Sequence, residues 1–250
     1  MTGKEKKYYA NSKIINRKSK MKKIGLVGGT GPESTLMYYK ELNQRIDRLT
    51  GGKAMPDIAI DSVNFHRFWG YVTDNELDLL TDYLVEKIDN LARTGTEVVS
   101  LTCATGHIVI DRIRLKTNTP LVSVPEAVCE KAKAMGYRKV GLLGTIFTME
   151  KDYMKQPFAN AGIDVFIPEP TDRQLIAKRI YEELELGIVK EQTLKEFQEI
   201  IGKMKAQNGI EAVILGCTEL PLLLNSANSP VACLDSVDIH IEKLIGLAMG

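Results

Sequence analysis

Two cysteines, Cys103 and Cys217, hold equivalent places in two similar stretches of the chain. Each ends an apolar run of strand type, Glu97–Cys103 in one stretch and Glu211–Cys217 in the other. A thiol at a strand end, close to the start of a helix, lies where backbone N–H groups and the helix dipole stabilise a thiolate. Two thiols that face one carbon from opposite sides could remove a proton from one face and deliver a proton to the other.

The similarity extends beyond the cysteines and indicates an internal duplication. Upstream, Lys23–Gly28 matches Lys139–Gly144, and downstream Asn118–Val124 matches Asn228–Leu234, in the same order and with little drift in spacing. A threonine also follows each cysteine closely, and these threonines are Thr105 and Thr218. The repeat predicts two pseudo-symmetric halves with one thiol in each. The other cysteines, Cys129 and Cys233, lie outside the duplicated positions and are expected to be core residues.

Glycine and threonine turns precede both cysteines and could bind an anion. Gly29 and Thr30 stand in a glycine-rich turn before a helix, and Thr145 and Thr148 stand in the matching turn. Backbone donors at a helix N-terminus bind carboxylates as well as phosphates. The first turn lacks the third glycine of a dinucleotide fingerprint, and the chain has no Walker loop. Two such turns beside two thiols suit a small amino acid or dicarboxylic acid.

Histidine offers an alternative chemistry. His107 follows Cys103 by one helical turn and could bind zinc together with Cys217. The simpler interpretation of His107, and of His240 in the last predicted helix, is a hydrogen-bonded wall residue, because no second ligand pair stands at metal spacing. Glu219 is either a helix-capping acid or a substrate contact, and the sequence leaves both open.

Strands alternate with helices along the chain from Met21, which predicts an α/β protein with parallel sheets and ligands at the carboxyl ends of the strands. The predicted strands are 24–27, 57–63, 98–101, 121–124, 140–143, 164–167, 213–215 and 231–234. The predicted helices begin at Pro32 and Glu219 and span 75–93, 108–113, 125–135, 149–160, 172–186, 190–207 and 237–248.

Composition narrows the class of protein. A formal charge of +1 over 250 residues argues against a nucleic-acid or anionic-membrane partner, and no apolar run is long enough for a membrane span. Four scattered cysteines favour a reduced, cytoplasmic protein. Residues 1–20 are basic and lack apolar periodicity, so we expect a disordered tail there, with a targeting or oligomerisation arm as the alternative.

Several motifs together resemble the aspartate/glutamate racemase family, over the chain from Lys22 onward. The motifs are Gly28-Gly-Thr-Gly-Pro-Glu-Ser-Thr35, Cys103-Ala-Thr-Gly-His107, Leu142-Leu-Gly-Thr145, Ile180-Tyr-Glu-Glu-Leu184, Gly216-Cys-Thr-Glu219 and Leu234-Asp-Ser-Val-Asp-Ile-His240. The resemblance implies two pseudo-symmetric parallel-sheet α/β domains with the active site between them, no pyridoxal phosphate, no metal, and a homodimer. It also implies that the first domain comprises 21–120 plus 231–250, and the second 121–230.

The resemblance gives Cys103 and Cys217 the roles of the two bases of a cofactor-independent amino-acid racemase. It also implies carboxylate contacts from the Gly29-Thr30 turn, Thr105, Thr145 and Thr218. The remaining expected site residues are Asn64, Thr148 and Glu219 for substrate binding, and His107 and His240 as supporting groups.

One residue departs from the family pattern. The family usually has asparagine where this chain has Ala104, which cannot offer an amide to the substrate. A cation for a side-chain carboxylate is also not evident, the candidates being Arg67, Arg173 and Lys178. The substrate could therefore be aspartate, glutamate or a wider range of amino acids. The alternatives are a related isomerase, decarboxylase or hydantoin racemase, a metal-dependent hydrolase, or a binding protein without turnover.

Overall fold

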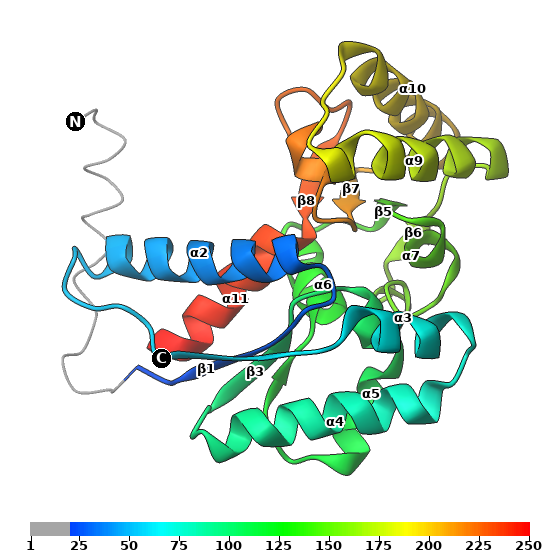
Figure 1. Ribbon diagram of the computed structural model, residues 1–250. Coiled ribbons are helices and arrows are strands. Elements are labelled where there is room, and N and C mark those ends of the chain that lie inside the picture. The colour runs from blue at the N-terminus through cyan, green and yellow to red at the C-terminus, as the bar shows by residue number, and fades with distance from the viewer. Residues whose placement is uncertain (1–20) are drawn as a thin grey trace.

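The structure is a computed structural model, and it describes residues 21–250 (Figure 1). The expected basic tail, residues 1–20, lies outside the described residues. The described chain forms two four-stranded parallel sheets with the same strand order, β2-β1-β3-β4 in the first and β6-β5-β7-β8 in the second. The family-based expectation of two pseudo-symmetric parallel-sheet α/β units is therefore confirmed.

The first sheet is built from buried apolar strands. Its members are β1 (Ile24–Gly28), β2 (Ile58–Ser62), β3 (Val98–Leu101) and β4 (Leu121–Val122). In the centre of the sheet Ile24 of β1 lies opposite Ile58 on one side and Val98 on the other. Every residue of β1 and β3 is buried, as expected for central parallel strands that are covered by helices on both faces.

The second sheet repeats this arrangement with β5 (Lys139–Leu143), β6 (Asp164–Phe166), β7 (Ala212–Leu215) and β8 (Ala232–Asp235). In both sheets the chain leaves the central strand toward one side and returns on the other. The gap between β1 and β3, and that between β5 and β7, is therefore a topological switch point, where α/β proteins bind ligands at the carboxyl ends of the strands.

Helices cover both faces of each sheet. In the first part of the chain these are α2 (Pro32–Leu49), α3 (Phe65–Thr73), α4 (Leu77–Arg93), the 3-10 turn η2 (Thr105–Val109), α5 (Ile110–Lys116) and α6 (Val124–Ala134). The second part has α7 (Ile146–Glu150), α8 (Gln156–Asn160), α9 (Pro170–Glu182), η3 (Leu184–Leu186), α10 (Glu191–Asn208), η4 (Leu220–Leu222) and α11 (Ser236–Met249). None of these helices is long and apolar enough to cross a membrane.

The two sheets exchange their last helices. After β4 of the first sheet, α6 packs into the apolar core of the second sheet, where Val128 lies with Val140 and Ile214. After β8 of the second sheet, α11 packs into the core of the first sheet, where Ile241 lies with Ile24. The two exchanged helices contact each other, and α11 also lies beside α2 (Figure 1). This exchange ties the two sheets into one body.

Strand pairing corrects the domain boundary that the family resemblance implied. The last strand, β8, pairs with β7 and belongs to the second sheet, whereas β4 pairs with β3 and belongs to the first. Only the final helix of residues 231–250 lies in the first core. The reason is the duplication itself, because in each copy the fourth strand follows the third by a short connection and pairs beside it.

Two predicted helices differ from the observed ones, and one observed helix was not predicted. The helix predicted over 149–160 is interrupted, since α7 ends at Glu150 and α8 begins only at Gln156. The helix predicted from Glu219 is the single 3-10 turn η4, because Pro221 removes one of its backbone donors. Helix α3 was not predicted at all. It begins at Asn64, whose Oδ1 accepts from the backbone N–H of Arg67 over 3.1 Å as an N-cap.

Candidate functional site

Cys103 lies just beyond the carboxyl end of β3 and is half-buried. Burial raises the pKa of its thiol, while the Thr30 hydroxyl and the backbone N–H groups of Gly106 and Thr105 act in the opposite direction. Oγ1 of Thr30 is buried and has no hydrogen-bond partner among residues 21–250, so it is free to donate. Thr30 and the two backbone N–H groups would each stabilise the Cys103 thiolate.

His107 holds the chain that carries Cys103 in place. Its Nδ1–H donates to the carbonyls of Cys103 over 3.0 Å and Ala104 over 3.1 Å, and its Nε2 accepts from the N–H of Val124 over 3.1 Å. The ring is buried, and this burial lowers its pKa to about 4. Both nitrogens are occupied in the neutral tautomer, so His107 is a wall residue and cannot bind a metal in this arrangement.

His240 lies beneath the same loop, with its ring centroid 6.4 Å from that of His107. Its Nδ1 lies 2.8 Å from the Tyr38 hydroxyl, and its Nε2–H donates to the carbonyl of Val122 over 3.1 Å. Burial lowers the pKa of His240 to about 3, and the nearby His107 lowers it further. The two supporting histidines are thus neutral structural groups below Cys103, and neither is placed as an acid or base.

The glycine turn after β1 serves mainly to bring the backbone close to β2. Gly29 has φ +84°, and a Cβ there would lie 2.4 Å from Oγ of Ser62 and 2.5 Å from the carbonyl of Val63. The N–H of Gly29 donates to Oγ1 of Thr35 over 3.0 Å. The turn therefore presents the Thr30 side chain to Cys103, while the amide of Gly29 is already used.

The corresponding turn after β5 carries two threonines that bond to each other. Thr145 caps α7 by accepting the N–H of Thr148 over 3.2 Å, and the two hydroxyls lie 3.1 Å apart. A Cβ on Gly144 would lie 2.9 Å from Cγ2 of Thr148, and one on Gly216 would lie 2.8 Å from the carbonyl of Leu143. Only glycine allows this close approach between the turn and the strand end before Cys217.

Cys217 follows β7 as Cys103 follows β3, but its surroundings are different. Its Sγ donates to Oε2 of Glu219 over 2.8 Å, and Oε1 of Glu219 accepts from Oγ1 of Thr218 over 2.5 Å. Burial, the charge of Glu219 and this hydrogen bond, with a smaller contribution from Glu185, raise the pKa of Cys217 well above its usual range. Glu219 stands at the N-cap position of η4, but its side chain makes no capping hydrogen bond and instead accepts one from the thiol beside it.

Tyr153 is a buried polar residue near the expected site, and no sequence pattern predicted it. Its hydroxyl lies 3.1 Å from Oγ1 of Thr148, and the side chain of Thr105, which follows Cys103, acts to lower the pKa of the phenol. Burial raises the pKa of the phenol, and the charges of Cys103 and Cys217 raise it further. One neutral hydroxyl is therefore within electrostatic reach of both cysteines. Tyr153 escaped prediction because its segment had the pattern of a continuous helix.

The predicted site residues of the second half form two hydrogen-bonded groups. The hydroxyls of Thr145 and Tyr153 both lie 3.1 Å from that of Thr148, while Glu219 bonds both Cys217 and Thr218. Asn64 lies at the carboxyl end of β2, but its Oδ1 is used as the cap of α3 and its N–H donates to the Tyr83 hydroxyl over 2.7 Å. It stands at the edge of the site.

The pKa of each thiol departs from the simple expectation of a thiolate stabilised at a helix start. Both pKa values are raised, because the cysteines are removed from water and because each is followed only by short 3-10 turns. The predicted inequality of the two surroundings is present. Donors surround Cys103, whereas a carboxylate faces Cys217.

Ala104 packs away from the thiol chemistry. Its methyl group contacts the apolar core shared by α6 and the second sheet, beside residues such as Val124 and Val128. The position that offers an amide in many relatives therefore contributes to the contact between the two sheets. Cys129 and Cys233 pack in or against apolar cores, as predicted, and Sγ of Cys129 donates to the carbonyl of Pro157 over 3.3 Å.

Comparison with known proteins shows which family shares this arrangement. The family model of Asp/Glu/hydantoin racemases matches residues 27–244. An aspartate racemase homologue from Pyrococcus horikoshii is 37% identical with a TM-score of 0.83, and the alignment covers 92% of this chain and 100% of that one. A protein from Yersinia pestis, provisionally described as an Asp/Glu racemase, is 34% identical with a TM-score of 0.87 over the same shares.

Similarity also extends to glutamate racemases. The enzyme from Aliivibrio fischeri is 28% identical over 194 residues, which are 76% of this chain and 66% of the length of that racemase. Since the family model spans nearly the whole described chain and the solved relatives share its two-sheet fold, this chain belongs to the Asp/Glu/hydantoin racemase family.

Proposed function

We propose that this protein is a cofactor-independent amino-acid racemase that inverts Cα with Cys103 and Cys217 as its two bases. The observation that carries the proposal is that each sheet has one cysteine just beyond the carboxyl end of its third strand, Cys103 after β3 and Cys217 after β7. The two cysteines come from different sheets, so a substrate held between the sheets would meet a thiol from each side. This is the arrangement that proton removal and delivery on opposite faces require.

The unequal thiols suggest the resting protonation state. The donors around Cys103 oppose the effect of burial, whereas Glu219 adds to it at Cys217. Cys103 is therefore the thiol that ionises first, and Cys217 keeps its proton. In one direction the Cys103 thiolate takes the α-proton and the Cys217 thiol donates to the opposite face. In the other direction the two roles are exchanged.

Hydroxyl groups from both sheets supply the remaining chemistry. Removal of the α-proton pushes negative charge onto the substrate carboxylate, so neutral donors placed there stabilise the transition state. The hydroxyls of Thr145, Thr148 and Tyr153 already form one hydrogen-bonded group, and Thr105 of the other half acts on the same phenol. Because the pKa of Tyr153 is raised, its phenol stays protonated and can act as a donor.

The proposal is tested by solvent deuterium exchange at Cα, measured by mass spectrometry for every L- and D-amino acid. Cys103→Ser and Cys217→Ser are each expected to slow racemisation by about 10³-fold or more, because a serine hydroxyl is a far weaker acid than a thiol. The matched controls are Cys129→Ser and Cys233→Ser, whose thiols pack in or against apolar cores and should keep most of the activity. Near-normal rates in both active-site variants would refute the proposal.

A metal-dependent hydrolase is the alternative from another class, and the geometry disfavours it. The proposed ligand His107 uses both ring nitrogens in hydrogen bonds to the backbone. Among residues 21–250 no group of three or more His, Cys, Asp or Glu side chains is placed to hold a metal ion. A hydrolase would lose activity to a chelator, whereas the two-thiol racemase would not.

We further propose that the protein is a homodimer and that it is located in the cytoplasm. A homodimer would have about twice the 27.8 kDa mass of the chain, which light scattering in solution measures directly. The four cysteines are all unpaired in the structure, which fits a reducing compartment such as the cytoplasm.

A further inference from the structure

The charged side chains that act on Cys217 are acidic. Glu219 bonds the thiol directly, and Glu185 in η3 is close enough to raise the pKa of Cys217. Glu185 is itself exposed, and the charge of Glu219 raises its pKa in addition to a larger effect of partial burial. Glu219 lies in the Gly216-Cys-Thr-Glu219 motif that resembles racemases of acidic amino acids, so it does not distinguish this chain from them. Glu185 lies outside that motif, and its charge would repel a substrate side-chain carboxylate that approached it.

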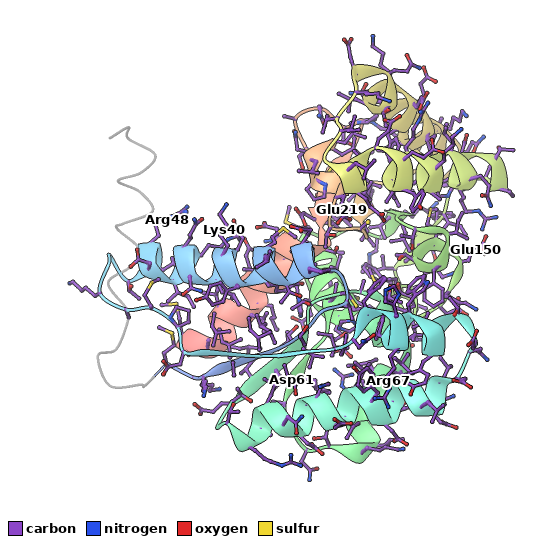
Figure 2. All side chains as sticks on the ribbon, viewed as in Figure 1. Lys40, Arg48, Asp61, Arg67, Glu150 and Glu219 are labelled. Carbon is purple, nitrogen blue, oxygen red and sulfur yellow. The ribbon has the colours of Figure 1, made fainter. Side chains whose placement is uncertain are left out.

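The arginines and the lysine that could anchor a side-chain carboxylate are used elsewhere. The guanidinium of Arg67 lies 4.4 Å from the ring centroid of Tyr83, and its Nε donates to the Tyr71 hydroxyl over 2.9 Å. Figure 2 shows Arg67 on the side of α3 that faces α4, away from Glu219. Its charge is therefore directed to the outer surface of the first sheet.

The other two candidates lie on α9. Nη1 of Arg173 pairs with Oε1 of Glu150 over 3.1 Å, at the end of α7 opposite to Thr145, while its buried Nε has no hydrogen-bond partner among residues 21–250. Figure 2 shows Glu150 at the outer edge of the molecule. Lys178 lies 4.0 Å from Glu182 in a pair whose two side chains are more than half exposed. Neither cation is placed beside the two thiols as Glu219 is.

Four aromatic rings form a continuous surface that leads outward from the site, and we call them the aromatic wall. The ring centroids of Tyr153 and Phe147 lie 6.0 Å apart, those of Phe147 and Trp69 lie 6.3 Å apart, and Phe65 stacks on Trp69 at 6.3 Å. Phe65 and Trp69 come from α3 and the other two from the segment after β5. The wall thus crosses between the sheets.

The outer part of the aromatic wall is exposed. Phe65 has 43% and Trp69 has 39% of its surface accessible. Large exposed aromatic rings that continue into a site of proposed chemistry are typical of ligand-binding surfaces. A cation is already present at this wall, because Nζ of Lys151 lies 5.7 Å from the ring centroid of Phe147. A second cation, from a basic substrate, would be repelled there.

The geometry points to an α-amino acid with an uncharged, mainly apolar side chain as the substrate, with that side chain lying along the aromatic wall. This inference rests on the proposed function and departs from the acidic substrates named for the relatives. The wall contributes apolar contact area to leucine, methionine or phenylalanine, and the Glu185 carboxylate disfavours acidic side chains.

A substrate panel tests the inference. The rates of Cα deuterium uptake are compared for both enantiomers of leucine, methionine, phenylalanine, alanine, aspartate, glutamate and lysine. We expect kcat/KM for the three large neutral amino acids to exceed that for aspartate, glutamate and lysine by about 10-fold or more. Fastest exchange with aspartate, glutamate or lysine would overturn this inference and leave the racemase proposal intact. Absence of exchange with every amino acid would overturn the proposed function as well.

A charge reversal separates the role of Glu185 from general effects. Glu185→Lys places a cation near Cys217 and should raise the kcat/KM ratio of aspartate to leucine by about 10-fold, chiefly through KM. The matched control is Glu182→Lys, which makes the same change at an exposed carboxylate of α9 that pairs only with Lys178. If the kcat/KM ratio of aspartate to leucine were equal in Glu185→Lys and Glu182→Lys, the placement of Glu185 would be contradicted.

The wall is tested at its exposed end. Trp69→Ala should lower kcat/KM for leucine and phenylalanine by about 5- to 20-fold through KM and leave alanine nearly unchanged, because only long side chains reach the ring. Leu115→Ala, at an 88% exposed leucine of α5, is the control. Equal losses for alanine and leucine in Trp69→Ala would refute the proposed contact.

Discussion

The thiol of Cys217 donates a hydrogen bond to Oε2 of Glu219 over 2.8 Å. A carboxylate therefore faces one of the two proposed bases, whereas hydroxyl and amide donors face the other. Since burial affects both thiols, Glu219 is the group that makes their pKa values unequal. The two halves of the duplicated chain have thus become chemically distinct at the atoms that carry the reaction.

Glu219→Gln should shift only the alkaline limb of the pH dependence of racemisation. The active form needs one thiolate and one thiol, so kcat/KM falls at high pH when the second thiol ionises. Glutamine removes the negative charge that raises the pKa of Cys217, so the alkaline limb should move to lower pH while the acid limb stays nearly fixed. The control is Glu182→Gln, and an alkaline limb that does not move would contradict the assignment.

Tyr153→Phe should reduce activity without unfolding the protein. The variant removes a hydroxyl that bonds Thr148, leaving that threonine with an unmatched group at the site. We expect a 10- to 100-fold loss of kcat/KM, equivalent to about 1.4–2.7 kcal/mol, from steady-state kinetics. Tyr181→Phe, which alters a tyrosine that is 73% exposed, should behave as wild type. Equal activity of the two variants would remove Tyr153 from the mechanism.

The buried histidines should make the fold sensitive to acid. The folded pKa values, about 4 for His107 and about 3 for His240, lie below the unfolded value near 6.5. The unfolded state therefore binds more protons, and the stabilising contribution is full above pH 6.5 and is lost as the pH falls toward 4 and 3. As the pH falls through this window, each histidine should lower the free energy of unfolding by on the order of 1 kcal/mol per pH unit.

Urea unfolding midpoints between pH 7 and pH 4 measure this effect. His240→Gln should flatten the pH dependence, although it lowers stability at pH 7 by breaking the bond to Tyr38. His66→Gln changes an exposed histidine and should keep the slope of the wild type. A wild-type midpoint that is constant over this range would show that the histidines are not buried in neutral form.

Gly216→Ala should damage the site beside Cys217. The added Cβ would lie 2.8 Å from the carbonyl of Leu143, so the strand end must shift, at a cost of about 1–3 kcal/mol in the free energy of unfolding. Gly202→Ala is the control, since nothing lies within 4 Å of a Cβ there and alanine favours the helix α10. Thermal unfolding and racemisation are measured for both, and a stable, fully active Gly216→Ala variant would contradict the close packing.

The internal repeat allowed much of this fold to be predicted. Alternating apolar strands and helices, with matched glycines and cysteines, predicted parallel sheets and the strand ends that carry Cys103 and Cys217. The prediction failed where local pattern and tertiary context disagree. The segment of Tyr153 has helical periodicity, yet α7 ends at Glu150 and α8 begins only at Gln156, and the Tyr153 hydroxyl between them contacts Thr148.

The sequence by itself determined the duplication, the strand ends, and the identity of the two thiols, because these depend on residue type and local spacing. Only the tertiary structure decided the exchange of α6 and α11, the contact of Tyr153 with Thr148, and the charges that act on Cys217. These relationships join residues far apart in the chain. The pKa of each thiol depends on the burial and the charges that such contacts create, and no local pattern in the sequence encodes them.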